Sequence, residues 1–401
     1  MGNEAKRTAV RWCKPMVARR PDEAHRASTP LELLFDLCFV VAVSQATAGL
    51  RQALSEGQLG TGALNYLFVF FAIWWAWMNF SWFASAYDTD DALYRLTTLV
   101  QIAGGLVLAA GVTPALQRQD FTVITEGYVI MRLAMVSQWL RAAKSDPPRR
   151  SAALVYAGGI AVLQLGWLCR LLLPRSLFLP GFAVLVAAEL LVPVVAERVA
   201  STTWNARHIT ERYGCFTLIV LGESVLSATI ALQSGIETRQ DVVGLLGVAV
   251  AGLLIVFSMW WLYFSQPGHE HLTSLRRAMV WGYGHLFIFS AAGAVGAGLG
   301  VAVDYDTHHC KLSGVAAGMA TTVPVSIYLL AVWLLHTGSR RPRPMRWRFP
   351  LVALFVFGAS FSPAPVHVTA AALAALVALG VQRSGFASSS QRVAEIARPD
   401  E

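Results

Sequence analysis

The chain consists of long apolar blocks separated by short islands of charged residues. A helix needs about 20 predominantly apolar residues to cross the hydrocarbon core of a bilayer. Of the 401 residues, 55% are hydrophobic and only 14% are charged, whereas soluble domains carry about 25% charged residues. The pattern excludes a cytosolic enzyme, a disordered regulator and a secreted disulfide scaffold. It predicts a multi-pass membrane protein.

The predicted fold is an all-α transmembrane helix bundle. Lipid offers the backbone no hydrogen-bond partners, and the sequence shows no alternating ten-residue segments of the kind found in β-barrels. We expect about 12 spans, or 10–12 because the last two are short and share the Pro363–Pro365 hinge. The expected spans are residues 31–49, 63–83, 95–114, 121–141, 151–173, 178–197, 213–234, 241–265, 278–301, 312–336, 349–362 and 364–381.

The distribution of basic residues predicts the orientation. Of the 32 Lys and Arg residues, 25 lie in the N-terminal segment, the tail and every second loop, and six lie in the opposite loops. Cytoplasmic loops are enriched in Lys and Arg. We therefore expect an inner-membrane protein of a bacterial cell with both termini in the cytoplasm. The first thirty residues are basic and polar, so the first apolar run is interpreted as a retained span rather than a cleaved signal peptide.

Short motifs recur in order in the two parts of the chain. A Phe-x-x-Trp-Trp motif ends the second span at Trp75 and the eighth at Trp261, and Arg95 and Arg277 each begin a later span. We interpret this as a duplicated unit with parallel halves, although paired Trp residues also mark membrane interfaces. The expected organisation is a cytoplasmic N-terminal segment (1–30), two six-helix halves (31–197 and 198–381) and a cytoplasmic tail (382–401).

The net charge of +8 does not indicate nucleic-acid binding, because the basic residues lie between apolar blocks and no zinc-finger spacing is present. We expect no nucleic-acid partner, no resident metal and no cofactor. The five cysteines are scattered without CxxC spacing, so a disulfide framework is not expected. The expected partners are membrane lipids and a small-molecule or lipid substrate.

Carboxylates within apolar spans are costly and mark functional sites. Glu32 and Asp36 lie one helical turn apart on one face of the first span, and their proximity predicts a protonated member or a basic partner. Glu223 lies near the middle of the seventh span. Glu32 as part of the helix start, and Glu223 as a neutral interhelical hydrogen-bond donor, are the structural alternatives.

Two further groups accompany these acids. His208, Glu211 and Arg212 precede the seventh span, with His208 and Arg212 on one helix face; they are candidates for an anionic head group or for interfacial anchoring. His285 lies among small residues in the ninth span, either bonded between helices or lining a pathway.

Another acidic group is Asp88-Thr89-Asp90-Asp91, which follows a run of aromatic residues. Its spelling is similar to the Asp-x-Asp-Asp motif of acid-initiated terpene cyclases, in which aromatic rings shield a carbocation. Three carboxylates in four residues also suit a divalent cation under this enzyme alternative. The structural alternative is a helix cap with a salt bridge to Arg95.

Several of these motifs together resemble the bacterial low temperature requirement A family. The matching segments are Glu32-Leu-Leu-Phe-Asp36-Leu-Cys-Phe-Val40, Tyr87-Asp88-Thr-Asp90-Asp91 with Tyr94-Arg95, Glu211-Arg212-Tyr213-Gly214 through Leu221-Gly222-Glu223-Ser224, Trp260-Trp261-Leu-Tyr263-Phe264 and Tyr283-Gly284-His285. The resemblance runs from about residue 25 to 300, and Ser265 stands where the family often has an acid. It implies a polytopic membrane protein linked to growth in the cold, and it supplies no catalytic residues.

The leading hypothesis is a proton-linked transporter for a small or amphipathic solute. Its pathway residues are Glu32, Asp36, His208, Glu211, Arg212, Glu223 and His285, and its aromatic lining is Trp74, Trp75, Trp77, Trp260, Trp261 and Tyr263. One alternative is an intramembrane enzyme acting on a lipid or isoprenoid, with its general acid among Asp36, Glu223, Asp88, Asp90 and Asp91. The other is a non-catalytic membrane protein that adjusts cold tolerance.

Overall fold

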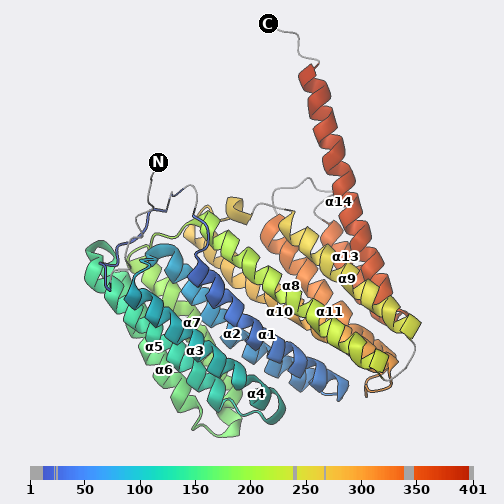
Figure 1. Cartoon of the computed structure of the whole chain (residues 1–401), viewed down its shortest axis with the longest axis horizontal. Helices are drawn as coiled ribbons and strands as arrows, with labels where there is room; N and C mark the ends of the chain where they lie inside the picture. Colours follow the sequence, from blue (N-terminus) through green and yellow to red (C-terminus); the bar gives the residue numbers. More distant parts are fainter. Residues whose placement is uncertain are drawn as a thin grey trace, which may run out of the picture. The chain divides into compact units, whose positions relative to one another are not determined.

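The computed structural model describes residues 12–21, 23, 26–237, 242–265, 268–337 and 347–396 (Figure 1). Within these residues the chain is helical, with turns and loops between the helices and no strand. The helices are α1 (Pro30–Ser55), α2 (Leu59–Tyr87), α3 (Ala92–Ala110), α4 (Val112–Arg118), α5 (Thr122–Ser145), α6 (Arg150–Arg170), α7 (Phe178–Val199), α8 (Ala206–Glu237), α9 (Val242–Phe264), α10 (Leu275–Asp306), α11 (Gly314–Val332), α13 (Arg348–Gly358) and α14 (Pro365–Ile396). Residues 1–11 of the predicted N-terminal segment, most of the basic loop before α13 and the last five residues lie outside the described residues.

The predicted all-α membrane architecture is confirmed. Among the described residues, eight helices are long and apolar enough to cross a membrane. They are Pro30–Ser55, Leu59–Tyr87, Ala92–Arg118, Pro147–Arg170, Arg175–Val199, Val243–Phe264, Leu275–Asp306 and Gly314–His336. Two shorter apolar helices, Arg348–Phe361 and Pro365–Val381, lie on either side of the predicted proline hinge. The count of 12 spans and the internal duplication stay predictions.

The chain divides into two compact units. Unit 1 comprises residues 1–49 and 64–216, and unit 2 comprises residues 50–63 and 217–401. The predicted halves, residues 31–197 and 198–381, stay a prediction.

In unit 1, α3, α5, α6 and α7 pack in chain order, each against the next. Glycines bring α3 and α5 close together: a Cβ at Gly127 would lie 2.3 Å from the Leu108 backbone nitrogen and 2.6 Å from the Gly104 carbonyl oxygen. Small residues allow such close backbone approach where lipid gives no hydrophobic drive to helix association. This close packing fixes the positions of the polar side chains of α5, α6 and α7.

In unit 2, α10 packs against α11, and α9 against α14. Gly298 of α10 faces the backbone of α11, where a Cβ would lie 2.2 Å from the Ala320 carbonyl oxygen. Ser224 of α8 donates a hydrogen bond of 2.9 Å to the Ala292 carbonyl. The small-residue run of α10 therefore serves close helix packing, as its composition predicts.

Candidate functional site

The site is built where the N-terminal turns of α1 and α8 meet in unit 1. Thr29 and Glu32 form a capping box at the start of α1: the Glu32 amide donates to Thr29 Oγ1 at 3.3 Å, and the Thr29 amide donates to Glu32 Oε2 at 2.8 Å. Asn205 caps α8, because its Oδ1 accepts from the His208 amide at 3.1 Å. Both helices therefore direct their positive dipole ends toward the same carboxylate-rich region.

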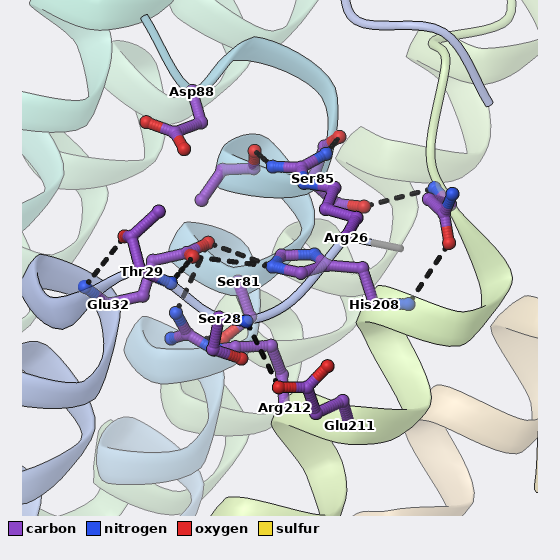
Figure 2. A network of polar contacts seen from close by, with 12 residues as sticks. Arg26, Ser28, Thr29, Glu32, Ser81, Ser85, Asp88, His208, Glu211 and Arg212 are labelled. Atoms are coloured by element: carbon purple, nitrogen blue, oxygen red, sulfur yellow. Dashed lines mark hydrogen bonds and ion pairs between the residues drawn. The ribbon is translucent and has the colours of Figure 1, made fainter. Parts of the chain in front are cut away.

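Four ionisable side chains from these two helices form the buried ion cluster, which we define as Glu32, Asp36, His208 and Arg212. Figure 2 shows Glu32, His208 and Arg212 close together. Each of them is at most 1% exposed. Glu32 Oε1 lies 3.1 Å from His208 Nε2 and 3.4 Å from Arg212 Nη1. Arg212 Nη2 lies 2.6 Å from Asp36 Oδ1. The one-turn spacing of the two acids thus lets a single guanidinium bridge them.

Residues of α2 complete the surroundings of the ion cluster. Trp77 donates its indole N–H to Asp36 Oδ1 at 2.7 Å, and Ser81 Oγ accepts from Arg212 at 3.1 Å. Arg26 donates to the carbonyl oxygens of Ala84 and Ser85 at the end of the same helix. The cluster is therefore enclosed by α1, α2, α8 and the segment before α1.

The net charge of the ion cluster and its charged neighbours depends on whether His208 is protonated. Nearby lie Asp88, which pairs with Arg19 at 3.4 Å, and Glu23, which pairs with Arg19 at 2.6 Å. The carboxylates Glu23, Glu32, Asp36 and Asp88 outnumber the guanidinium groups of Arg19, Arg26 and Arg212 by one. Protonation of His208, or of one carboxylate, makes the whole group neutral.

The pKa of the loop acid Asp88 is shifted by this environment. Burial raises its pKa to about 6, and the nearby charge of Glu32 acts in the same direction. In contrast, the hydrogen bond and charge of Arg19 lower the pKa of Glu23, which burial alone would raise. A carboxyl group that titrates near pH 6 suits proton exchange near neutral pH.

Some polar atoms of the ion cluster are buried without a hydrogen-bond partner. Among the described residues these include Asp36 Oδ2, His208 Nδ1 and Arg212 Nε. Buried polar atoms normally find partners, and an unsatisfied one costs about 1–3 kcal/mol. The arrangement therefore has spare donors and acceptors for a proton or a polar solute.

Glu211 differs from its neighbours on α8. It is exposed, and its Oε1 accepts from the Ser28 amide at 3.0 Å (Figure 2). Its role is to hold the segment before α1 against α8.

The carboxylates of Asp88-Thr89-Asp90-Asp91 each contact a different arginine. Asp90 pairs with Arg95 at 2.7 Å, and both side chains are about half exposed. Asp91 caps α3 by accepting from the Tyr94 amide at 2.8 Å, and it also pairs with Arg141. These contacts agree with the structural alternative of a helix cap and salt bridge. A cation bound by Asp88, Asp90 and Asp91 stays a prediction; among the described residues, no group of three His, Cys, Asp or Glu side chains is arranged to hold a metal ion.

A buried carboxylate outside the ion cluster, Glu189 of α7, was missed by the sequence analysis. It is 0% exposed and accepts hydrogen bonds from side chains of α2, α5 and α6. The donors are Tyr128 at 2.8 Å, Arg132 at 2.8 Å, Trp75 at 2.9 Å, Trp167 at 3.1 Å and Gln164 at 3.4 Å. The signal was available, since Glu189 lies in the middle of a predicted span.

The aromatic residues predicted to line a pocket have more varied roles. Trp75 and Trp77 are fully buried and donate to the carboxylates Glu189 and Asp36. Trp74 is also buried, at 1% exposed. Trp260 and Trp261 of α9 are 43% and 46% exposed, as expected of side chains at a lipid interface.

Unit 2 contains the other two predicted pathway residues. His285 is fully buried; its Nδ1 donates to the Trp281 carbonyl at 2.7 Å, so its Nε2 accepts from the Tyr263 hydroxyl at 3.0 Å. The His336 ring lies 5.5 Å away from the His285 ring, and the sequence analysis had missed it. Glu223 is 3% exposed. Asp36 thus lies in unit 1, and Glu223 and His285 lie in unit 2.

The fold and the site together define a multi-helix integral membrane protein with ionisable side chains buried among its apolar helices. The family model of the bacterial low temperature requirement A protein (LtrA) matches residues 27–381. The chain belongs to this family. The match extends beyond residue 300, where the resemblance recognised in the sequence ended.

A curated relative is also similar to the chain. It is the uncharacterized protein RA0937 of Rhizobium meliloti (strain 1021), which is 27% identical over 249 residues. The match covers 60% of this chain and 58% of the relative. The chain therefore aligns with little more than half of that relative's length.

Proposed function

We propose that this LtrA-family protein is a proton-linked transporter of a small or amphipathic solute, and that the ion cluster in unit 1 binds the coupling proton. The observation that carries the proposal is the pairing of Glu32 with His208 at 3.1 Å, both at most 1% exposed. Ionisable side chains inside membrane bundles are costly and mark ion or proton pathways.

The charge balance of the cluster favours a single exchangeable proton. With His208 neutral, the group carries one excess negative charge, and a proton shared by His208 and Glu32 removes it. Arg212 cannot give up its own proton, but it contacts both Glu32 and Asp36. A change in the charge of Glu32 therefore alters how Arg212 is shared between the two acids.

This sharing gives the proton a mechanical consequence. When Glu32 is neutral, Arg212 is drawn fully to Asp36, with which it already makes its shorter contact of 2.6 Å. Because Glu32 also caps α1, its protonation weakens the favourable interaction of a carboxylate with the helix N-terminus. Proton binding thus biases the position of the first turn of α1, which is the kind of two-state element that couples a proton to a solute.

We place the protein in the inner membrane of a bacterial cell with both termini in the cytoplasm. The support is the excess of Lys and Arg in alternate loops. In this orientation the ion cluster, at the start of α1 and α8, lies near the cytoplasmic side. Membrane lipids and the solute are its partners, and Glu223 and His285 are further proposed pathway residues.

The test compares cells that produce the native chain, Glu32→Gln or His208→Gln at matched membrane levels. Small molecules and lipids in cells and medium are profiled by mass spectrometry, with external pH at 5.5 and at 7.5, and with and without a protonophore. We expect existing compounds to redistribute between cells and medium with the native chain and the control but not with Glu32→Gln or His208→Gln, and the protonophore to abolish the redistribution. Glu56→Gln, which removes an exposed acid just beyond α1, is the matched control.

Two outcomes contradict the proposal. A compound formed only with the native chain, and absent from both pools otherwise, indicates an enzyme. A redistribution that survives in both variants and in the presence of the protonophore indicates that neither the cluster nor the proton gradient drives the movement.

A further inference from the structure

Arg170, at the end of α6, is a buried cation surrounded by aromatic rings. It is 3% exposed. Its guanidinium carbon lies 3.9 Å from the centroid of the Phe178 ring and 5.2 Å from that of Phe182. The rings of Phe121 and Trp167 lie at 5.4 Å and 5.6 Å. Aromatic faces attract a cation, but they leave the hydrogen-bond donors on its edges unsatisfied.

One edge of this guanidinium is free. In the part of the chain that the structure describes, Nε and Nη2 of Arg170 have no hydrogen-bond partner, and no carboxylate forms an ion pair with Arg170. These two nitrogens present parallel N–H groups that lie in the guanidinium plane along one edge. That edge matches the two oxygens of a carboxylate or phosphate in a bidentate contact.

A cavity of about 30 Å³ lies beside Arg170. Its lining includes Phe68, Phe71, Ala72, Tyr128 and Trp167, together with Arg170 itself. About 10–15 Å³ is enough for one water molecule, so the cavity has room for about two water-sized groups, such as two oxygens of an anionic head. Its walls are almost entirely apolar apart from Arg170, which suits a ligand whose charged head is attached to an apolar body.

The nearby acid Glu189 does not neutralise Arg170. Tyr128 and Trp167 line the cavity and also donate to Glu189, but Glu189 pairs with Arg132 at 2.8 Å. That ion pair is neutral as a whole, so the charge of Arg170 is uncompensated. An unpaired charge within membrane helices is costly, and an anion from outside the chain removes the cost.

We propose that Arg170 and the adjoining aromatic cavity bind the anionic head, a carboxylate or a phosphate, of an amphipathic ligand. The site lies away from the ion cluster: Phe71 and Ser81 are ten residues apart on α2, or about 15 Å along its axis. The proposal goes beyond proton-linked transport and does not depend on it, since a bound lipid and a transported solute both satisfy it.

Binding to the purified full chain in a neutral maltoside detergent tests the proposal. The probes are dodecanoate, dodecyl phosphate, dodecanol and acetate, titrated by calorimetry. We expect dodecanoate and dodecyl phosphate to bind, and dodecanol and acetate to bind at least about tenfold more weakly, because each lacks the head or the apolar body. Native mass spectrometry of the protein extracted from membranes then shows whether the natural occupant is a phospholipid or a free carboxylate.

Variants separate the site from general partitioning into the micelle. Arg170→Gln removes the charge, and Ala72→Leu fills the cavity while Arg170 remains; each is expected to weaken dodecanoate binding at least about tenfold. Arg175→Gln, at an exposed arginine in the next loop, is the matched control and should bind normally. If Arg170→Gln does not fold, Ala72→Leu decides the test.

The proposal is overturned if dodecanol binds as tightly as dodecanoate, or if Ala72→Leu binds dodecanoate like the native chain. It is also overturned if no anionic probe binds. A response confined to acetate contradicts the amphipathic ligand and indicates a site for small free anions.

Discussion

Unit 1 contains two buried carboxylate sites that differ in how fully they are satisfied. Glu189 accepts from five side chains, which fills both of its oxygens. The pair Glu32 and Asp36 shares one arginine, one histidine and one indole, and Asp36 Oδ2 has no hydrogen-bond partner among the described residues.

The difference separates an acid whose contacts hold helices together from two acids that share a partner. The donors around Glu189 come from α2, α5 and α6 and join these helices to α7. Glu32 and Asp36 have fewer donors, and Arg212 contacts both of them. A change at one of these two acids therefore also affects the contacts of the other.

The largest effect on the free energy of unfolding is expected at Glu189, the carboxylate with five donors. Glu189→Gln replaces one acceptor oxygen with a donor that opposes the surrounding donors, and it leaves Arg132 buried without a counter-charge. Breaking a buried ion pair in this way costs about 3–5 kcal/mol. The free energy of unfolding of the purified chain, measured by chemical denaturation and tryptophan fluorescence, should fall by this amount.

A double variant provides the control. Arg132→Met added to Glu189→Gln removes the unpaired charge and should recover part of the lost stability. Full stability in the single variant would mean that Glu189 is not the anchor of this network.

A smaller effect is expected at the ion cluster. Glu32→Gln keeps an oxygen that can accept from the Thr29 amide, and Arg212 keeps its contact with Asp36. The free energy of unfolding should fall by only about 1–2 kcal/mol, the cost of unsatisfied hydrogen bonds. The same denaturation experiment compares it directly with Glu189→Gln, and an equal or larger loss would reverse the assignment of the two sites.

The pH dependence of stability sharpens the comparison through Asp88. Its pKa in the fold, about 6, lies above the ordinary value of 3.8 because burial disfavours its charge. The stabilising contribution of the protonated form is therefore fully present below pH 3.8 and is lost as the pH rises through about 6. We expect the native chain to lose about 2–3 kcal/mol over this interval, and Asp88→Asn to lose less.

Unfolding measured at a series of pH values between 3.5 and 7.5 checks this difference between native chain and variant. Parallel curves for the two proteins would show that Asp88 titrates at its ordinary value in the fold.

The smallest effect is expected at the exposed acid Asp90. Its pair with Arg95 is about half exposed on both sides, and such pairs contribute about 0–1 kcal/mol. Asp90→Ala should therefore unfold almost like the native chain, whereas Asp91→Ala loses the cap of α3, worth about 0.5–2 kcal/mol. Loss of a membrane-linked activity in Asp90→Ala at native stability would revive the acid-motif alternative.

The sequence by itself determined the helical membrane architecture. A bilayer imposes long apolar helices, and this requirement is written into residue composition without reference to any distant contact. The motifs around Glu32, Glu211 and Tyr263 also identified the family. The one-turn spacing of Glu32 and Asp36 predicted either a protonated acid or a basic partner, since two acids that close repel each other.

Only the tertiary structure decided which partner each polar residue has. Arg212 lies 176 positions from Asp36, and Trp77 lies 41 positions from it. Arg132 and Glu189 are 57 positions apart, and each alone looks like an isolated charge in an apolar span. Spacing along one helix fixes which side chains share a face, whereas the contact between two helices depends on how their surfaces pack. For that reason the two acids of α1 could be selected from the sequence, but the distinction between a saturated carboxylate and an unsaturated one required the fold.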